Sequence, residues 1–409
     1  MSRSRAFVAS IAIVAALGAA PAAGPGRTAP FVGRWEATVV VNQVEVPFRF
    51  DIEPHGGALT GVFFNGDRRI ESTGSHVDEG VLTLDFDQYA TKLRVSAVAD
   101  TLTGEYQRAK GAYAFKAVRF VEREAAPEAA VPAIGGVWVV KARSRKGETA
   151  WRFIVEQRAA DVSATILRVD GDTGTLSGRY RDGRFVLSHF SGVRPLVLDV
   201  IPQADGTLTL RENETTELVA AREDAPEAAA FGAPSDPAAH TRMKDPSAPF
   251  QFSFPDLDGH LVSSTDARFA GKVILVSVGG SWCPNCHDEA PFLAGLYRRY
   301  RAQGLEIVSL SFEEADQLVN PTRLRAFIAS YGIEYPVLLA GEPDELAAKV
   351  PQADHLDAFP TTFVIGRDGR VREVHAGFPS PGSGEFYTSA VADLTGEVER
   401  LLAEPEGIR

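Results

Sequence analysis

The chain has only two cysteines, Cys283 and Cys286, within the segment SWCPNCH at residues 281–287. They follow an apolar run at residues 273–278, which predicts a buried strand, and they open a segment that predicts a helix. The unpaired N–H groups and the dipole of a helix N-terminus favour the thiolate form of a thiol placed there. A second thiol one turn further on is close enough to form a disulfide. The spacing therefore predicts a redox-active pair held at a strand-to-helix turn.

Residues 1–23 have the pattern of a cleavable export signal. Arg3 and Arg5 precede an apolar stretch at residues 6–20, and residues 20–22 (APA) form a small-residue cleavage site. An uncleaved membrane anchor is the alternative. No cysteine follows the apolar stretch, so lipid attachment there is excluded. We therefore expect a periplasmic or other extracytoplasmic location in a bacterial envelope.

The length of 409 residues predicts two or three domains. A net charge of −12 disfavours binding to nucleic acid. Exported proteins commonly use disulfides as structural cross-links, but this chain has no cysteines beyond the one pair. The pair is therefore expected to be catalytic.

Residues 31–121 and 134–220 predict two β-rich repeats. Three segments of the first, at residues 33–35, 48–50 and 80–84, resemble segments of the second at one common offset (136 − 33, 151 − 48 and 183 − 80 each give 103). Both repeats begin with Gly-x-Trp, and a Trp at a strand start is typical of a core position. We predict a duplicated antiparallel all-β region, either two barrels or one sandwich.

The rest of the chain predicts a linker and a different kind of domain. Residues 221–247 are rich in Ala, Pro, Asp and Glu and are expected to be extended and mobile. From residue 248 onward, strand and helix patterns alternate, which predicts an α/β fold with a central mixed sheet. The protein is thus expected to be multidomain, with the α/β domain last.

Residues 248–405 resemble the thioredoxin superfamily and, within it, the exported TlpA/ResA-like disulfide reductases. The resemblance is carried by FPDLDGH at residues 254–260 with Gly271-Lys272, by WCPNC at residues 282–286 with Glu289 and Pro291, by FPTTF at residues 359–363 and by RDGR at residues 367–370. It implies a thioredoxin-like fold, with no cofactor and no metal.

The chemistry of the motif agrees with this resemblance. Cys283, at the helix start, is expected to be the exposed nucleophile that attacks a partner's disulfide, and Cys286 to resolve the mixed disulfide. Glu289 lies three residues beyond Cys286 on the same helical face. If it points inward, its pKa is raised and it can move the proton of the resolving thiol.

The resemblance also implies a docking site and partners. Pro360 is expected to be a cis-proline beside the cysteines, in a docking site with Trp282, Pro284, Phe359 and Thr361. The expected partners are exported proteins that contain disulfides and a membrane thiol donor. The β-rich region is expected to bind a protein or a small ligand.

Three other readings remain open. Cys283-x-x-Cys286-His287 is also the attachment signature of c-type haem. A peroxidase of the same fold is the second alternative. Such an enzyme needs a Thr or Ser to orient the peroxide three positions before the reactive cysteine, where this chain has Gly280. The β-rich region could itself be the working part, binding a ligand or partner in the envelope with the cysteines as a redox sensor. Zinc is disfavoured, because one Cys-x-x-Cys pair leaves its coordination incomplete.

Overall fold

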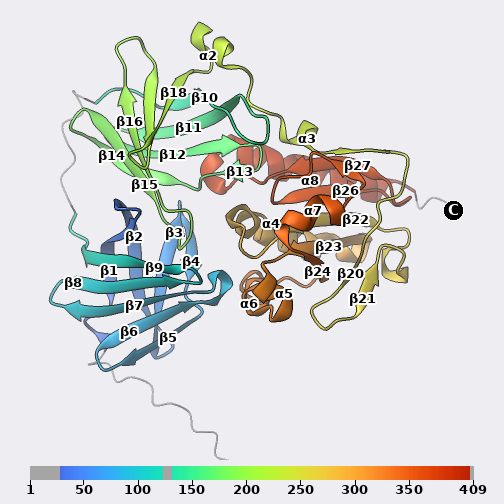
Figure 1. Ribbon diagram of the computed structural model, residues 1–409, viewed down its shortest axis with the longest axis horizontal. Coiled ribbons are helices and arrows are strands. Elements are labelled where there is room, and N and C mark those ends of the chain that lie inside the picture. The colour runs from blue at the N-terminus through green and yellow to red at the C-terminus, as the bar shows by residue number, and fades with distance from the viewer. Residues whose placement is uncertain (1–27, 123–130, 406–409) are drawn as a thin grey trace, which may run out of the picture.

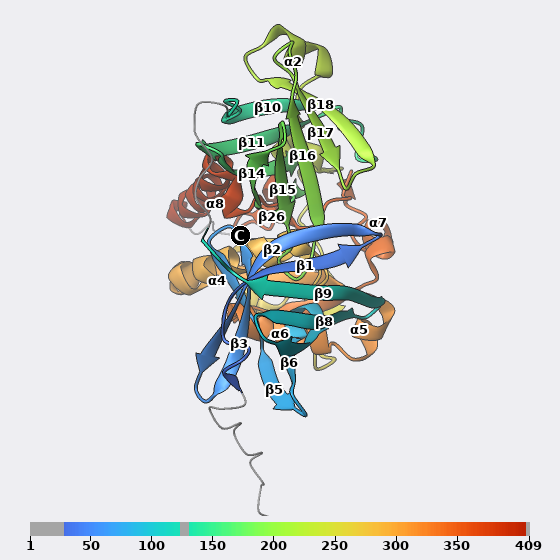
Figure 2. The same ribbon diagram turned by 90° about the vertical axis from the view of Figure 1, so that its left-hand side faces the viewer.

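The computed structural model describes residues 28–122 and 131–405, which form two β units and one α/β domain (Figure 1). The first β unit (residues 33–119) and the second β unit (residues 136–222) lie one above the other, on the same side of the α/β domain (Figure 2). The predicted export signal lies outside the described residues. Within the described ranges, no helix is long and apolar enough to cross a membrane.

The first β unit is an open, antiparallel half-barrel. Its strands are β1 (Gly33–Val41), β2 (Val44–His55), β3 (Ala58–Asn65), β4 (Arg68–Glu71), β5 (Gly74–Asp78), β6 (Val81–Phe86), β7 (Thr91–Val98), β8 (Thr101–Arg108) and β9 (Gly111–Arg119). They are ordered β4-β3-β2-β1-β9-β8-β7-β6-β5. Alternate residues of β1, including Trp35, Ala37 and Val39, are buried, as expected for a strand with one face in a core.

The second β unit closes into a barrel. Its strands are β10 (Gly136–Lys141), β11 (Ala150–Arg158), β12 (Asp161–Arg168), β13 (Gly171–Asp172), β14 (Leu176–Arg181), β15 (Arg184–His189), β16 (Leu196–Pro202), β17 (Leu208–Glu212) and β18 (Thr216–Arg222). Pairing of β11 with β12 joins the two ends of the row β11-β10-β18-β17-β16-β15-β14-β12. Of the two arrangements left open by the sequence, two barrels or one sandwich, the first is correct for this unit, while the first β unit remains an open half-barrel.

The two β units repeat one another in detail at their first strands. Trp35 Nε1 donates a hydrogen bond of 2.9 Å to the oxygen of Phe31, and Trp138 Nε1 donates one of 2.9 Å to the oxygen of Ile134. Both indoles are buried, and each lies beneath a guanidinium group, that of Arg119 or that of Arg222. These pairs keep the offset of 103 residues that the sequence shows (138 − 35 and 222 − 119).

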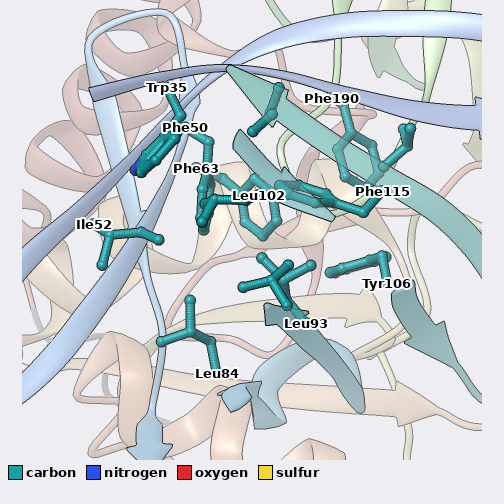
Figure 3. Close-up of a cluster of buried hydrophobic side chains, with 14 of the residues drawn as sticks. Trp35, Phe50, Ile52, Phe63, Leu84, Leu93, Leu102, Tyr106, Phe115 and Phe190 are labelled. Carbon is teal, nitrogen blue, oxygen red and sulfur yellow. The ribbon is translucent and has the colours of Figure 1, made fainter. Parts of the chain in front are cut away.

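A side chain of the second β unit completes the core of the first. Phe190 lies in the loop between β15 and β16 and is buried among aromatic rings of the half-barrel (Figure 3). Its ring centroid is 4.9 Å from that of Phe48 and 5.4 Å from that of Phe63. In the same loop, the oxygen of Gly192 accepts a hydrogen bond from Tyr106. The two units are therefore packed together through this loop.

The α/β domain has a five-stranded mixed sheet, as the sequence predicts. Its main elements are β22 (Val273–Gly279), α4 (Pro284–Tyr300), β23 (Leu305–Phe312), α5 (Ala315–Val319), α6 (Thr322–Tyr331), β24 (Val337–Gly341), α7 (Leu346–Lys349), β26 (Thr361–Ile365), β27 (Val371–Ala376) and α8 (Glu385–Ala403), with a hairpin of β20 (Ser253–Pro255) and β21 (Leu261–Ser263). The sheet order is β24-β23-β22-β26-β27. β22 is buried along its whole length and is the central strand.

The stretch at residues 221–247 differs from the expected extended linker. β18 continues to Arg222, and the short helices α2 (Pro226–Phe231) and α3 (Pro237–His240) follow, with β19 (Arg242–Met243) paired to β25 (Ala353–Asp354). Ala228 of α2 is buried against Val139, Ala150 and Ala221. The stretch thus forms two short helices and one local packing contact, although most of its residues stay exposed or only partly buried.

Candidate active site

The cysteine pair lies where the buried strand β22 turns into α4. Cys283 is the N-cap of α4, and its Sγ accepts a hydrogen bond of 3.3 Å from the backbone N–H of Cys286. Pro284 occupies the first turn, where its missing N–H leaves no hydrogen bond unmade. Both cysteines are free thiols. The strand and the helix thus present two sulfur atoms at one helix N-terminus, as the sequence predicts.

The expected docking segment lies directly against this turn. The Phe359–Pro360 peptide bond is cis, which confirms the expectation for Pro360. The Cys283 thiol donates to the oxygen of Phe359 at 3.4 Å, and Thr361, which begins β26, pairs with Val278 of β22. The ring of Trp282 lies 5.2 Å from that of Phe359 between centroids. The residues assigned to docking and the cysteines therefore share one corner of the domain.

Glu289 points into the interior, as expected. Its carboxylate accepts a hydrogen bond of 2.9 Å from Ser277 and one of 2.7 Å from Thr362. Burial raises the pKa of Glu289 to about 7, although these two hydrogen bonds oppose the shift. Burial also raises the pKa of Cys286 well above its ordinary value, with smaller contributions from Cys283 and Glu289. The carboxyl of Glu289, with its own pKa of about 7, thus contributes to the raised pKa of Cys286.

The expectation of an exposed Cys283 is wrong in this arrangement. Cys283 is only 3% exposed and Cys286 only 5%. Asn285, between the two cysteines, contacts the second β unit, since it donates a hydrogen bond of 2.5 Å to the oxygen of Asp170. Sequence reasoning could not show this, since it treated the two regions as separate units.

His287 is not arranged as a haem ligand. Its Nδ1 lies 2.8 Å from the hydroxyl of Tyr331, and its Nε2 lies 2.8 Å from the oxygen of Ser281. The ring also packs against Tyr89 and Phe327 and is buried. Burial lowers the pKa of His287 to about 3, so the imidazole is neutral. Both ring nitrogens are already engaged, which argues against the haem reading.

Gly280 does not fit the peroxidase reading. A Cβ atom at this position would lie 2.4 Å from Trp282 Nε1 and 2.5 Å from the oxygen of Phe312. These distances are shorter than van der Waals contact, so no Thr or Ser side chain fits there. The backbone at Gly280 therefore leaves no space for the hydroxyl side chain that would orient a peroxide.

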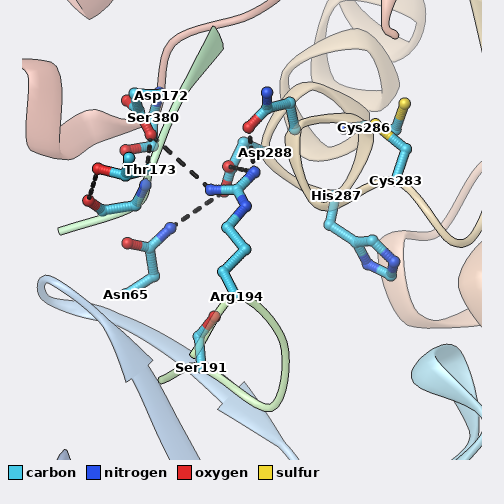
Figure 4. A network of polar contacts seen from close by, with 12 residues as sticks. Asn65, Asp172, Thr173, Ser191, Arg194, Cys283, Cys286, His287, Asp288 and Ser380 are labelled. Carbon is cyan, nitrogen blue, oxygen red and sulfur yellow. Dashed lines mark hydrogen bonds and ion pairs between the residues drawn. The ribbon is translucent and has the colours of Figure 1, made fainter. Parts of the chain in front are cut away.

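Charged residues that the sequence did not single out also meet at α4. Asp288 is buried, and its carboxylate lies 2.8 Å from Arg68 of the first β unit. The same carboxylate lies 3.3 Å from Arg194 of the second β unit (Figure 4). Asn65 Nδ2 donates to the same carboxylate at 3.3 Å. Burial raises the pKa of Asp288, while the two arginines act in the opposite direction. Asp288 therefore ties the redox helix to both β units.

A second polar cluster supports the segment just before the cysteines. Glu313 accepts hydrogen bonds of 2.7 Å from both the backbone N–H and the hydroxyl of Ser281. Arg323 pairs with Glu313 at 2.8 Å and donates to the hydroxyl of Ser281 at 2.8 Å. No local sequence pattern marks these residues, because they come from three separate segments.

A mixed sheet with a Cys-x-x-Cys pair at a helix N-terminus and a cis-proline loop beside it defines a thioredoxin-like redox domain. Residues 246–374 match the AhpC/TSA family. The C-terminal third of the chain is an AhpC/TSA-type thioredoxin-like domain, homologous to the ResA thiol-disulfide oxidoreductases. This confirms the family resemblance and the fold expected for this part of the chain.

The similarity to individual proteins is confined to this domain. The thiol-disulfide oxidoreductase ResA of Bacillus subtilis (strain 168) is 31% identical over 126 residues, which cover 31% of this chain and 64% of ResA. ResA of Bacillus anthracis is 30% identical over 122 residues, which cover 30% and 64%. The chain thus spans somewhat less than two thirds of these relatives. A thioredoxin-family thiol:disulfide interchange protein from Chlorobium tepidum TLS is 26% identical, covers 40% of this chain and 100% of its own, and has a TM-score of 0.31.

Proposed function

We propose that this protein is an exported thiol:disulfide oxidoreductase that reduces protein disulfides through Cys283 and Cys286. The observation that carries the proposal is the placement of both thiols at the start of α4, against the cis-proline loop and with buried Glu289 nearby. The homologous ResA proteins are thiol-disulfide oxidoreductases, which supports the same chemistry here. The signal-like pattern at residues 1–23 supports export.

The reaction is a pair of thiol–disulfide exchanges. The thiolate of Cys283 attacks one sulfur of a substrate disulfide, so that a mixed disulfide forms, the substrate S–S bond breaks and one substrate thiolate leaves. The thiolate of Cys286 then attacks Cys283 Sγ, which breaks the mixed disulfide and releases the second substrate thiolate. The substrate gains two electrons and two protons, and this protein keeps the Cys283–Cys286 disulfide.

Glu289 assists the second exchange. Cys286 attacks only as a thiolate, but burial raises its pKa, so that the thiol stays protonated at neutral pH. A carboxyl with a pKa of about 7 is ionised in a substantial fraction of molecules at neutral pH and accepts that proton. The same carboxyl then returns the proton to solvent once the disulfide has formed.

The cycle requires a partner at each end. In the envelope the substrates are exported proteins that contain disulfides, and they dock at Trp282, Pro284, Phe359, Pro360 and Thr361. The oxidised pair must be reduced again by two electrons from a dithiol, which we assign to a membrane protein. The thiolate of that donor attacks the Cys283–Cys286 disulfide, and the donor leaves as a disulfide.

Substitution of each cysteine tests the proposal. Cys283→Ser is expected to abolish reduction of insulin disulfides, because the attacking sulfur is lost, whereas Cys286→Ser is expected to accumulate mixed disulfides that mass spectrometry identifies. The double variant is the matched control and should capture nothing. Full turnover by Cys283→Ser, or capture by the double variant equal to that by Cys286→Ser, would contradict the proposal.

A further inference from the structure

One end of the second β unit lies on the redox centre itself. Gly171, in β13, forms a parallel bridge with Phe378, which follows β27 in the α/β domain. The preceding residue, Asp170, accepts the hydrogen bond from Asn285 of the Cys-x-x-Cys segment. Val169 packs in one buried cluster with Ala358 of the cis-proline loop and Ala376 of β27. Residues 169–172 and Arg194 are called the covering segment below.

The contact brings the two backbones close together at two glycines. A Cβ on Gly171 would lie 2.5 Å from Asn285 Nδ2 and 2.6 Å from the oxygen of Phe378. A Cβ on Gly377 would lie 2.4 Å from the carbonyl carbon of Asp170 and 2.6 Å from the nitrogen of Gly171. Each side of the contact thus has a glycine where the other side leaves no room for a larger residue. The two backbones are therefore in close contact at these two glycines.

Charged and polar groups fix the covering segment in place (Figure 4). The Arg194 guanidinium donates to Asn285 Oδ1 and lies 3.3 Å from Asp288 and 3.8 Å from Asp172. Asp172 in turn accepts hydrogen bonds of 2.7 Å from the N–H of Ser380 and 2.5 Å from the hydroxyl of Ser383. Its carboxylate is fully buried. Removal of one partner of such a buried pair leaves an uncompensated buried charge, which is destabilising.

The covering segment occupies the side of the redox centre on which a substrate chain is expected to lie. Gly377, which touches it, donates a hydrogen bond of 2.7 Å to the oxygen of Pro360. With this segment in place, Cys283 is 3% exposed. An attacking sulfur must be approached directly by the disulfide that it breaks, and a disulfide carried on a polypeptide cannot reach so buried an atom.

We propose that the second β unit is an internal cover of the redox centre, which must withdraw before a protein disulfide reaches Cys283. This proposal rests on the proposed function. For a reactive dithiol, such a cover prevents indiscriminate oxidation and reaction. Withdrawal separates Gly171 from Phe378 and Arg194 from Asn285 and Asp288, and leaves the fold of the α/β domain unchanged. The partner that displaces the cover thereby gains access to the cysteines.

Thiol accessibility in the full-length reduced protein tests the cover without any turnover. The chain has no cysteine besides the pair, so alkylation reports on this site alone. The rates with iodoacetamide and with a maleimide carrying a polyethylene glycol chain are measured for wild type, Arg194→Ala and Gly171→Ala. Both variants change only the covering segment. We expect each to raise the rate with the bulky reagent by about tenfold or more, as loss of about 1.4 kcal/mol of contact free energy would do.

Two control variants match these changes. Gly183→Ala introduces a Cβ at a glycine of similar positive φ (+82°, against +113° at Gly171) with no atom within 4 Å, and Arg179→Ala breaks an exposed pair with Asp161 in the same unit. Both should label as slowly as wild type. If wild type reacts with the bulky maleimide as fast as a small unstructured thiol peptide, or if neither covering variant reacts faster than its control, the cover is refuted. Retained activity in Cys283→Ser would refute the proposed function and leave this result standing.

Discussion

Glu289 is the residue whose environment most clearly matches a chemical role, and its titration is measurable. Its pKa in the folded protein is about 7, against an ordinary value of 4.5. Between these values the unfolded chain has lost the proton while the folded protein keeps it, so the free energy of unfolding falls as the pH rises through this interval. Below about pH 4.5 the two states are protonated alike, and above about pH 7 the loss is complete.

Glu289→Gln is therefore expected to remove this pH dependence. From pH 4.5 to pH 7, the free energy of unfolding of wild type should fall relative to that of the variant by about 3 kcal/mol, since one pKa unit corresponds to about 1.4 kcal/mol. Urea unfolding at a series of pH values measures the difference. Exposed Glu105→Gln provides the matched control and should run parallel to wild type. Parallel curves for Glu289→Gln would show that the carboxyl does not titrate as described.

The sequence identified the residues of the redox motif but not those that hold it. The start of a helix at Cys283, the inward direction of Glu289 and the cis bond of Pro360 were predictable because spacing and family resemblance are local features, whereas the burial of Cys283 was not. Asp288 looks like an ordinary solvated helix residue in the sequence, yet it pairs with arginines 220 and 94 positions away. The residues next to these arginines in the sequence do not predict such a contact.

At the scale of elements, the loop between β15 and β16 connects the parts of the molecule. Its Phe190 completes the aromatic core of the first β unit, and its Arg194 contacts α4. Only four positions separate the two residues, so one short loop contacts both the first β unit and α4. Arg194 of the covering segment therefore lies in a loop that Phe190 anchors in the core of the first β unit.

Phe190→Ala is expected to destabilise the protein by about 3–5 kcal/mol, because it leaves a cavity among rings that do not collapse easily. Denaturant unfolding measures this loss. Phe120→Ala, at a half-exposed ring with 42% of its surface accessible, is the control and should cost much less. An equal effect of the two substitutions would show that Phe190 is not a core residue of the first β unit.

The secondary structure was predictable where the apolar pattern has a clear period. Alternation of apolar and polar residues marked the strands. The offset of 103 residues indicated a duplication, and the equivalent hydrogen bonds of Trp35 and Trp138 agree with it. Closure of the second unit depends on pairing of β11 with β12, which the pattern of single strands does not specify. The helices α2 and α3 were missed because Ala- and Pro-rich composition does not distinguish a packed surface segment from a free linker.

For the whole molecule, the arrangement of the three parts determines access to the cysteines. The buried residues of the two main cores of the α/β domain all come from residues 250–401, so this domain has a complete interior of its own. Its contact with the β units combines hydrogen bonds, ion pairs and a backbone bridge with smaller apolar contacts such as that of Val169. Such an interface between units could not be predicted from the sequence, because each side of it reads as an ordinary surface loop.

The fragment of residues 248–409 is accordingly expected to reduce insulin disulfides at least as fast as the full chain, because it keeps both cysteines, Glu289 and Pro360 and loses the cover. Turnover per molecule measured under identical conditions makes the comparison, with the Cys283→Ser fragment as the control. A folded but inactive fragment would contradict this expectation and show that the activity requires the β units.

The most direct test of the central claim is a redox titration of the full-length protein, with its free thiols counted by mass after alkylation. We predict a single transition in which both thiols disappear together as one intramolecular disulfide, with a two-electron slope of about 30 mV per tenfold change in the ratio of oxidised to reduced protein. Two thiols that stay free across the range of physiological thiol buffers, or that pair only between molecules, would contradict the assignment of Cys283 and Cys286 as a cycling redox pair.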